Sequence, residues 1–297
     1  MRRRLFVSAA GLGLAGCAAT PDLARSPAAT LPGSHRLDLA DAAGGRTWRV
    51  WVQAPAGPAP AGGHPVLVVL DGNASFALAA QLARNDAARP AGMRPDPAIV
   101  VGIGHPGDAV YHPAERQRDY TPAVPGRDDP ASGGADRLLD FIVGDVMSRV
   151  AAVWPVDARR TTLSGHSFGG LFTLHALFTR PAAFARYAAA SPSLWWGQGV
   201  VLREADRFIA SPRPIEADVQ LRAGALETAS AAANAARAAV QQERRVLDRT
   251  RELADRLTAL GWPGLHVDMG VVPAADHGAV MAPALADALA FAQRPRA

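Results

Sequence analysis

The amino-acid sequence predicts an α/β fold in which a mainly parallel central sheet, opened by an N-terminal antiparallel hairpin, carries helices on both faces. Three observations predict it. The first strand-like segments alternate apolar and polar residues on either side of a Gly-containing turn, which is typical of a hairpin. Later strand candidates are continuous apolar runs, as expected of strands buried on both faces. These runs alternate with helical segments, the order that produces a parallel sheet. The 297 residues suffice for one large domain of this kind.

The elements are expected in the following order along the chain. The hairpin strands cover residues 35–39 and 48–53, and a Pro/Gly loop follows over 55–63. Further expected elements are strand 66–70, a helix near 75–84, strand 98–101, a long loop over 105–134, helix 135–153, strand 161–163, helix 170–178, strands 187–190 and 219–223, one or two helices within 228–260, and strand 265–271. The long loop is rich in Pro, Gly, Asp and Arg, and a loop of this length usually carries function or forms a lid.

The first residues are expected to form a targeting signal. Three arginines at positions 2–4 precede an apolar run over residues 5–15, which is too short to span a bilayer. The ending Leu14-Ala15-Gly16-Cys17 resembles a bacterial lipobox, in which the cysteine is lipidated. We therefore expect a lipoprotein signal peptide over residues 1–16, a tether over 17–33 and the α/β domain over 34–297. The alternative is a plain signal peptide cut elsewhere, with Cys17 incidental.

Cys17 is the only cysteine of the chain, so no intramolecular disulfide can form although the destination is oxidising. Ala18 rather than aspartate follows it, which does not favour retention in the inner membrane. The expected location is the periplasm, anchored through lipid to a membrane, with the inner leaflet of the outer membrane favoured. The arginine-rich start leaves export by the Sec or the twin-arginine route open.

Charge and motif content exclude several partners. Loss of the three signal arginines lowers the formal net charge from +4 to +1, so the mature domain has no general attraction for phosphate backbones, and we expect no nucleic-acid partner. Residues 102–107 match G-x-G-x-x-G after a strand, but prolines follow where a helix should start, which argues against dinucleotide binding. Cysteine pairs, H-E-x-x-H and EF-hand spacings are absent from the sequence, so we expect no metal and no cofactor.

Gly165-His166-Ser167-Phe168-Gly169 fits the G-x-S-x-G pattern of a nucleophile elbow. Such a serine sits in a strained turn between a strand and a helix, and flanking side chains would collide with neighbouring backbone. The N–H groups that open the helix would lie beside a developing oxyanion. The expected strand before Ser167 and helix after it predict an α/β-hydrolase fold with Ser167 as nucleophile. His166 is expected to be a packing or hydrogen-bonding residue of the elbow.

The other two members of a triad should follow the serine in the order acid, then histidine. His266 lies within the last expected strand, whereas His277 lies in the loop after it, where ligands bind in open α/β sheets. We therefore expect His277 to be the base. Glu227 just follows the end of the strand over 219–223 and is the favoured acid, while Asp276 remains the alternative. The acid would hold the imidazole tautomer and stabilise the imidazolium.

An oxyanion hole should combine the Phe168 N–H with a second backbone donor after the strand over 66–70. Gly72 and Asn73 are the candidates, because a tight turn at Gly72 would let the backbone approach a ligand. The alternative is that these residues form a simple turn between a strand and a helix.

Six segments in this order resemble the putative-esterase branch of the α/β hydrolases, which includes esterase D, and most closely the periplasmic siderophore trilactone esterases. They are residues 70–73, 116–122, 165–172, 191–196, 224–227 and 276–278. The resemblance implies that Ser167 and His277 are catalytic, that Arg116 lies near the bound ester, and that Trp195 and Trp196 wall the site. An anionic, aromatic catecholate ester would suit an arginine and two tryptophans. The alternative is a structural pair of Arg116 with Asp119 and two buried tryptophans.

The resemblance predicts a serine carboxylic-ester hydrolase that opens siderophore trilactones through an acyl-enzyme. Its expected partners are a small-molecule ester, such as a ferric catecholate siderophore, and a membrane reached through the lipid anchor. The alternatives are a general short-chain or aryl esterase, an acyltransferase of the same fold, and a lipoprotein that binds a siderophore without cleaving it. The intact elbow and the position of His277 argue against the last.

Overall fold

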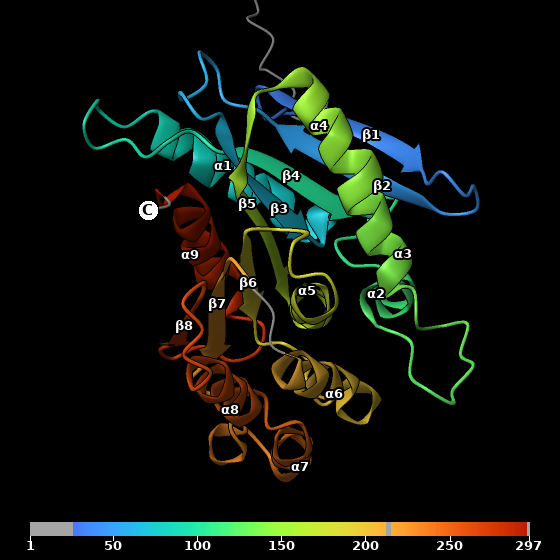
Figure 1. Cartoon of the computed structure of the whole chain (residues 1–297). Coiled ribbons are helices and arrows are strands. Elements are labelled where there is room, and N and C mark those ends of the chain that lie inside the picture. Colours follow the sequence, from blue (N-terminus) through green and yellow to red (C-terminus); the bar gives the residue numbers. More distant parts are fainter. Residues whose placement is uncertain (1–25, 212–214, 296–297) are drawn as a thin grey trace, which may run out of the picture. The chain divides into compact units, whose positions relative to one another are not determined.

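The computed structural model describes residues 26–211 and 215–295 (Figure 1). The chain divides into two units, residues 1–32 and 33–297, and the fold described here is that of the second unit. The expected signal peptide over 1–16, Cys17 and most of the tether lie outside the described residues. No helix among the described residues is long and apolar enough to cross a bilayer.

The predicted fold class is confirmed: the second unit is built on one mainly parallel sheet. Its eight strands lie in the order β1-β2-β4-β3-β5-β6-β7-β8. Strand β2 is antiparallel to β1 and to β4, and the other neighbours are parallel. The strands are β1 (Ser34–Ala40), β2 (Thr47–Gln53), β3 (His64–Leu70), β4 (Ile99–Gly104), β5 (Val156–His166), β6 (Arg186–Ala190), β7 (Ala217–Gly224) and β8 (Leu265–Val272).

Burial follows the sequence pattern that predicted the strands. Every residue of β3 and β4 is buried, as their continuous apolar runs require in a sheet covered on both faces. The first strand of the hairpin is largely exposed, because it forms one edge of the sheet. Burying these valines, leucines and isoleucines stabilises the centre of the sheet by about 25 cal/mol for each Å² of apolar surface.

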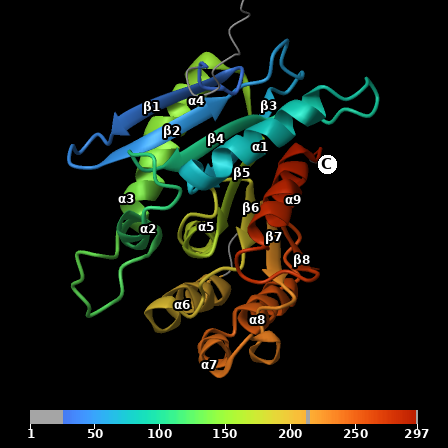
Figure 2. The same cartoon turned by 180° about the vertical axis from the view of Figure 1, so that it is seen from behind.

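Helices cover both faces of the sheet. Helices α1 and α9 lie side by side on one face (Figure 2), and α3, α4, α5 and α8 cover the other, with α6 packed against α5. Their bounds are α1 (Gly72–Ala87), α2 (Pro113–Tyr120), α3 (Ala135–Asp140), the π-helical turn η2 (Phe141–Val146), α4 (Met147–Val153), α5 (Phe168–Thr179), α6 (Trp196–Ala210), the 3₁₀ turn η3 (Ala229–Ala231), α7 (Ala235–Arg244), α8 (Val246–Thr258) and α9 (Met281–Gln293).

The structure corrects the expected long loop over 105–134, because α2 lies inside it. Pro113 occupies the first turn of α2, where a missing backbone N–H costs nothing. The helix buries only Asp119 and Tyr120, so it lacks the apolar spacing by which a helix is detected in sequence. Helices α6 and α9 were also not predicted. The expected helix over 135–153 exists as α3, η2 and α4 in succession.

A buried histidine joins three helices beneath the sheet. His175 of α5 contacts Glu204 of α6 at 2.9 Å through Nδ1 and Asp136 of α3 at 3.3 Å through Nε2. Burial lowers the pKa of His175, but the two carboxylates outweigh burial and raise it to about 9. The imidazole is therefore protonated at neutral pH and holds α3, α5 and α6 together by charge.

The strand order reverses between β3 and β5. The chain leaves β3 for β4 on one side and returns to β5 on the other side. Ligands of open α/β sheets bind at such a reversal of strand order. The turn at Asp71 follows β3 and the elbow at Ser167 follows β5, so both predicted parts of the site end up at this reversal.

Candidate active site

Ser167 lies in the sharp turn between β5 and α5, as the sequence predicted. Its backbone has φ 61° and ψ −115°, a conformation that costs a non-glycine residue about 1–3 kcal/mol. Hydrogen bonds hold the turn: Ser167 N–H donates to Ala190 O at 3.0 Å, and Ser193 N–H donates to Ser167 O at 3.2 Å. A Cβ at Gly165 would lie 2.3 Å from the carbonyl of Gly169, so glycine is required there.

The structure brings Ser167, His277 and Glu227 into one hydrogen-bonded chain. His277 Nε2 lies 3.0 Å from Ser167 Oγ, and His277 Nδ1 lies 2.6 Å from Glu227 Oε1. Both distances are within the reach required of a nucleophile, its base and the group that orients the base. An ionised carboxylate only accepts, so the proton lies on Nδ1 and the lone pair of Nε2 faces the serine hydroxyl.

Glu227 is 4% exposed and its second oxygen is fully engaged. Oε2 accepts hydrogen bonds from Ser191 Oγ at 2.6 Å and from Gly224 N–H at 2.7 Å. Burial raises the pKa of Glu227, but the bonds from His277, Ser191 and Gly224 outweigh burial and lower this pKa from its ordinary value. Glu227 is therefore a carboxylate at neutral pH. The sequence analysis did not predict a role for Ser191. A serine after a strand is too common to indicate a role by itself.

Asp276, the alternative acid, makes different contacts. Its Oδ1 accepts hydrogen bonds from the N–H groups of Gly278 at 3.0 Å and Ala279 at 2.9 Å, so it shapes the loop that carries His277. This loop packs against the end of β7, where a Cβ on Gly224 would lie 2.3 Å from Ala275 O. Glycine at position 224 thus permits the close approach that brings Glu227 within reach of His277.

The candidate oxyanion donors are the first residues of two helices. Phe168 opens α5, and Gly72 and Asn73 open α1, so their backbone N–H groups have no acceptor within their own helices. Gly72 lies under Trp51, and a Cβ there would be 2.7 Å from the indole ring. The side chain of Asn73 bonds both backbone groups of His105, at 3.0 and 3.1 Å, which leaves only its N–H as a candidate donor.

Helix α2 fixes the turn that precedes these donors. Asp71 has φ 52°, and its N–H donates to Tyr120 Oη at 2.9 Å. Its carboxylate binds Arg116 in a bidentate pair, at 2.5 Å to Nε and 3.0 Å to Nη2. The guanidinium carbon lies 5.9 Å from the ring centre of Phe168. Arg116 therefore lies beside the elbow, with its charge matched by Asp71.

The alternative pairing of Arg116 with Asp119 is wrong. Asp119 is fully buried and accepts hydrogen bonds from four side chains, which are Arg46, Trp48, His105 and Arg118. Burial raises the pKa of Asp119, but these donors outweigh it and hold the pKa far below its ordinary value. This carboxylate anchors α2 to β2 and β4, and sequence spacing could not show which arginine faces it.

The two tryptophans differ in exposure. Trp196 is 8% exposed and belongs to the core, whereas Trp195 is partly exposed. The Trp195 ring lies 6.3 Å from the Phe168 ring, and the guanidinium of Arg244 lies over it at 4.4 Å. Sequence reasoning did not single out Arg244, because nothing in the sequence shows that α7 reaches this ring.

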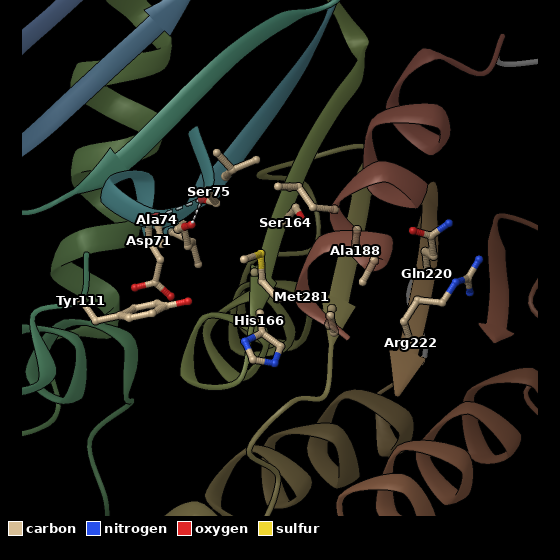
Figure 3. Close-up of a pocket in the computed structure, with 17 residues that line it drawn as sticks. Asp71, Ala74, Ser75, Tyr111, Ser164, His166, Ala188, Gln220, Arg222 and Met281 are labelled. Carbon is tan, nitrogen blue, oxygen red and sulfur yellow. Dashed lines mark hydrogen bonds between the residues drawn. The ribbon is translucent and has the colours of Figure 1, made fainter. Parts of the chain in front are cut away.

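His166 supports the backbone of the site and is not part of the hydrogen-bonded chain of Ser167, His277 and Glu227. Its Nε2–H donates to His277 O at 2.8 Å. Burial, followed by the charge of His277, lowers the pKa of His166 to about 4, so it is neutral at pH 7. Figure 3 shows that His166 lines a pocket together with Asp71, Tyr111 and Met281.

In the part of the chain that the structure describes, no group of three or more His, Cys, Asp or Glu side chains is arranged to hold a metal ion.

Comparisons with known proteins agree with this geometry. The model of the family described as "Putative esterase" matches residues 42–264. Ferri-bacillibactin esterase BesA of Bacillus subtilis is 32% identical over 283 residues, covering 91% of this chain and 93% of that protein. The siderophore enterobactin esterase of Emericella nidulans is 37% identical over 250 residues, covering 75% and 80%. Siderophore hydrolase EstB of Aspergillus nidulans superposes with a TM-score of 0.81 at 30% identity, over 91% of this chain and 100% of that structure.

Proposed function

Because this chain belongs to the "Putative esterase" family and is an ester-hydrolysing enzyme, we propose that it opens siderophore trilactones through an acyl-enzyme on Ser167. The observation that carries the mechanism is the continuous hydrogen-bonded chain from Ser167 Oγ through His277 to Glu227. The names of the relatives support the choice of substrate, since BesA and the Emericella protein are siderophore esterases.

The proposed mechanism follows from the contacts of the three side chains. His277 Nε2 takes the proton of Ser167 as Oγ attacks the ester carbonyl, and Glu227 stabilises the imidazolium that forms. The Phe168 N–H, with Gly72 or Asn73 N–H as the second donor, stabilises the developing oxyanion. The protonated His277 then returns its proton to the leaving alkoxide. His277 then takes a proton from water as the water oxygen attacks the acyl carbonyl. The proton passes to Ser167 Oγ as the acyl group leaves.

A panel of esters tests the substrate. The protein is incubated with an iron-free and an iron-loaded catecholate trilactone, beside neutral nitrophenyl esters, and products are identified by mass. We expect each trilactone to gain one water and open to the linear ester. Cleavage of nitrophenyl esters alone would indicate a general esterase, products carrying an added alcohol would indicate an acyltransferase, and bound but intact trilactone would indicate a binding protein.

We also propose that the mature protein is a periplasmic lipoprotein anchored through Cys17, with the inner leaflet of the outer membrane as its location. The support is sequence alone: a lone cysteine ends a short apolar run behind three arginines. Several acyl chains on one residue would hold the protein at the membrane far more firmly than a single chain.

A further inference from the structure

Helix α7 carries arginines on one face. Arg237, Gln241 and Arg244 are spaced at i, i+4 and i+7, which places them on the same side of a helix. No residue of α7 is buried, so the helix contributes little to the core. It lies between Glu227 and His277 in the sequence and next to α8 in Figure 1.

This face lies near the sequence neighbours of Ser167, Glu227 and His277. Arg244 lies 4.4 Å over the ring of Trp195, which contacts Phe168, the residue after Ser167. Gln241 Nε2 donates to the carbonyl of Leu226, the residue before Glu227, at 3.4 Å. The pKa of Asp276, the residue before His277, is lowered chiefly by the Ala279 N–H and in smaller part by the charges of His277 and Arg237.

Among the described residues, neither of these two arginines is held in an ion pair. Within residues 26–211 and 215–295, no carboxylate forms an ion pair with Arg237 or Arg244. By contrast, Arg116 is neutralised by Asp71 at 2.5 Å. Unlike Arg116, Arg244 beside Trp195 is therefore available to pair with an anionic ligand.

The stacking of Arg244 on Trp195 defines what it can bind. A guanidinium held face-on to an aromatic ring keeps the N–H donors at its edge free for an anionic oxygen. Its planar geometry suits two oxygens presented side by side, as in a carboxylate or a catecholate. Stacking also restricts the long side chain before a ligand arrives, which reduces the entropy lost on binding.

We infer that Arg244 stacked on Trp195, together with Arg237, forms an anion-binding subsite of the active site that recognises a negatively charged aromatic group of the ester substrate. These three residues are called the α7 subsite. The inference deepens the proposed function and rests on it for the identity of the natural ligand. Arg244 and Arg237 contact the charged group, and Trp195 positions Arg244.

Two small esters isolate the effect of charge. Phenyl acetate and 4-acetoxybenzoate share the acyl group and the ring, and differ by one carboxylate. The measured quantity is the ratio of kcat/KM for the anionic ester to that for the neutral ester. We expect Arg244→Gln to lower this ratio by about tenfold and Arg237→Gln with Arg244→Gln to lower it further, mainly through KM. Trp195→Leu should lower the ratio in part, because Arg244 loses its support.

Arg36→Gln is the matched control. Arg36 lies in β1, at the opposite edge of the sheet from β8, and the substitution removes one exposed positive charge. The ratio should stay at its wild-type value in this variant. A ratio unchanged in the double α7 variant, or lowered equally by Arg36→Gln, would overturn the inference. A general structural defect would lower kcat/KM for both esters and leave the ratio where it was, which also contradicts it.

The test of the α7 subsite can succeed or fail independently of the test of the proposed function. If the α7 variants lower the ratio while the wild-type protein leaves trilactones intact, the subsite stands and the proposed natural substrate is wrong. If trilactones are opened and the ratio does not respond, the proposed function stands and the subsite is wrong.

Discussion

Replacement of Glu227 by glutamine tests whether the carboxylate fixes the tautomer of His277. In the wild-type protein Oε2 accepts the Gly224 N–H at 2.7 Å, and Oε1 faces His277 Nδ1 at 2.6 Å. A backbone N–H can only donate, so the amide oxygen of the introduced side chain should turn toward Gly224. The amide NH₂ then faces Nδ1, which must accept. The imidazole proton moves to Nε2, and His277 can no longer take a proton from Ser167.

The size of the effect follows from these contacts. The reactive tautomer requires the amide to flip, which loses the bond from Gly224 N–H and sets two donors against each other in a buried position. A lost bond and a buried unsatisfied donor cost about 1–3 kcal/mol each. Their sum of about 2 to 6 kcal/mol corresponds to a decrease of roughly 30- to 25,000-fold in kcat.

The assay combines kinetics and NMR. Turnover of a nitrophenyl ester gives kcat, and the ¹⁵N chemical shifts of the His277 ring report which nitrogen carries the proton. Asp276→Asn is the control: an amide oxygen can still accept from Gly278 and Ala279, so activity should stay within about twofold of wild type. Activity of Glu227→Gln within about tenfold of wild type, or a proton that stays on Nδ1, would refute the reasoning.

Four further substitutions have defined expected outcomes. Ser167→Ala should lower ester turnover by about 10⁴- to 10⁶-fold with an unchanged melting temperature, since only the nucleophilic oxygen is lost. Cys17→Ser should move the protein from the membrane to the soluble fraction without acyl mass, as fractionation and intact mass would show. Arg116→Lys should lower kcat about equally for neutral and anionic esters, because one ammonium cannot replace the bidentate hold on Asp71. His175→Gln removes the ion pairs of the protonated imidazole. The difference in unfolding free energy between wild type and this variant should be greatest below about pH 6.5, and it should fall by up to about 3 kcal/mol as the pH rises through about 9.

Each of these has a contrary outcome. Residual activity of Ser167→Ala near the wild-type rate would remove the nucleophile assignment. Wild-type protein recovered soluble, without added acyl mass, would remove the lipid anchor. A selective loss on the anionic ester in Arg116→Lys would give Arg116 the role assigned to the α7 subsite. A difference in stability that does not change with pH would mean that His175 is not held protonated by Asp136 and Glu204.

The meeting of Ser167, Glu227 and His277 was predictable because each of these residues follows a strand. Ser167 follows β5, Glu227 follows β7 and His277 follows β8, and the ends of parallel strands meet at one edge of a sheet. Sequence order alone thus brought these three residues to one place. The same reasoning put strand 66–70 and its turn at Gly72 beside the elbow.

The helices that surround the site were less predictable. Helix α2 carries a buried acid and few apolar residues, so its apolar spacing gave no signal. The partner of Arg116 depends on which side of α2 faces β3, and that is decided by the packing of Tyr120 and Asp119 rather than by local sequence. The stacking of Arg244 on Trp195 joins residues far apart in the chain, and no spacing rule predicts such a contact.

Rapid quenching of the enzyme with an iron-loaded catecholate trilactone, followed by mass spectrometry of its peptides, tests the central claim most directly. The account predicts a transient adduct of the opened trilactone on the peptide that contains Ser167, which accumulates before the linear product and is absent from Ser167→Ala. An intact trilactone with no adduct on Ser167, under conditions in which the same enzyme hydrolyses a neutral nitrophenyl ester, would contradict it.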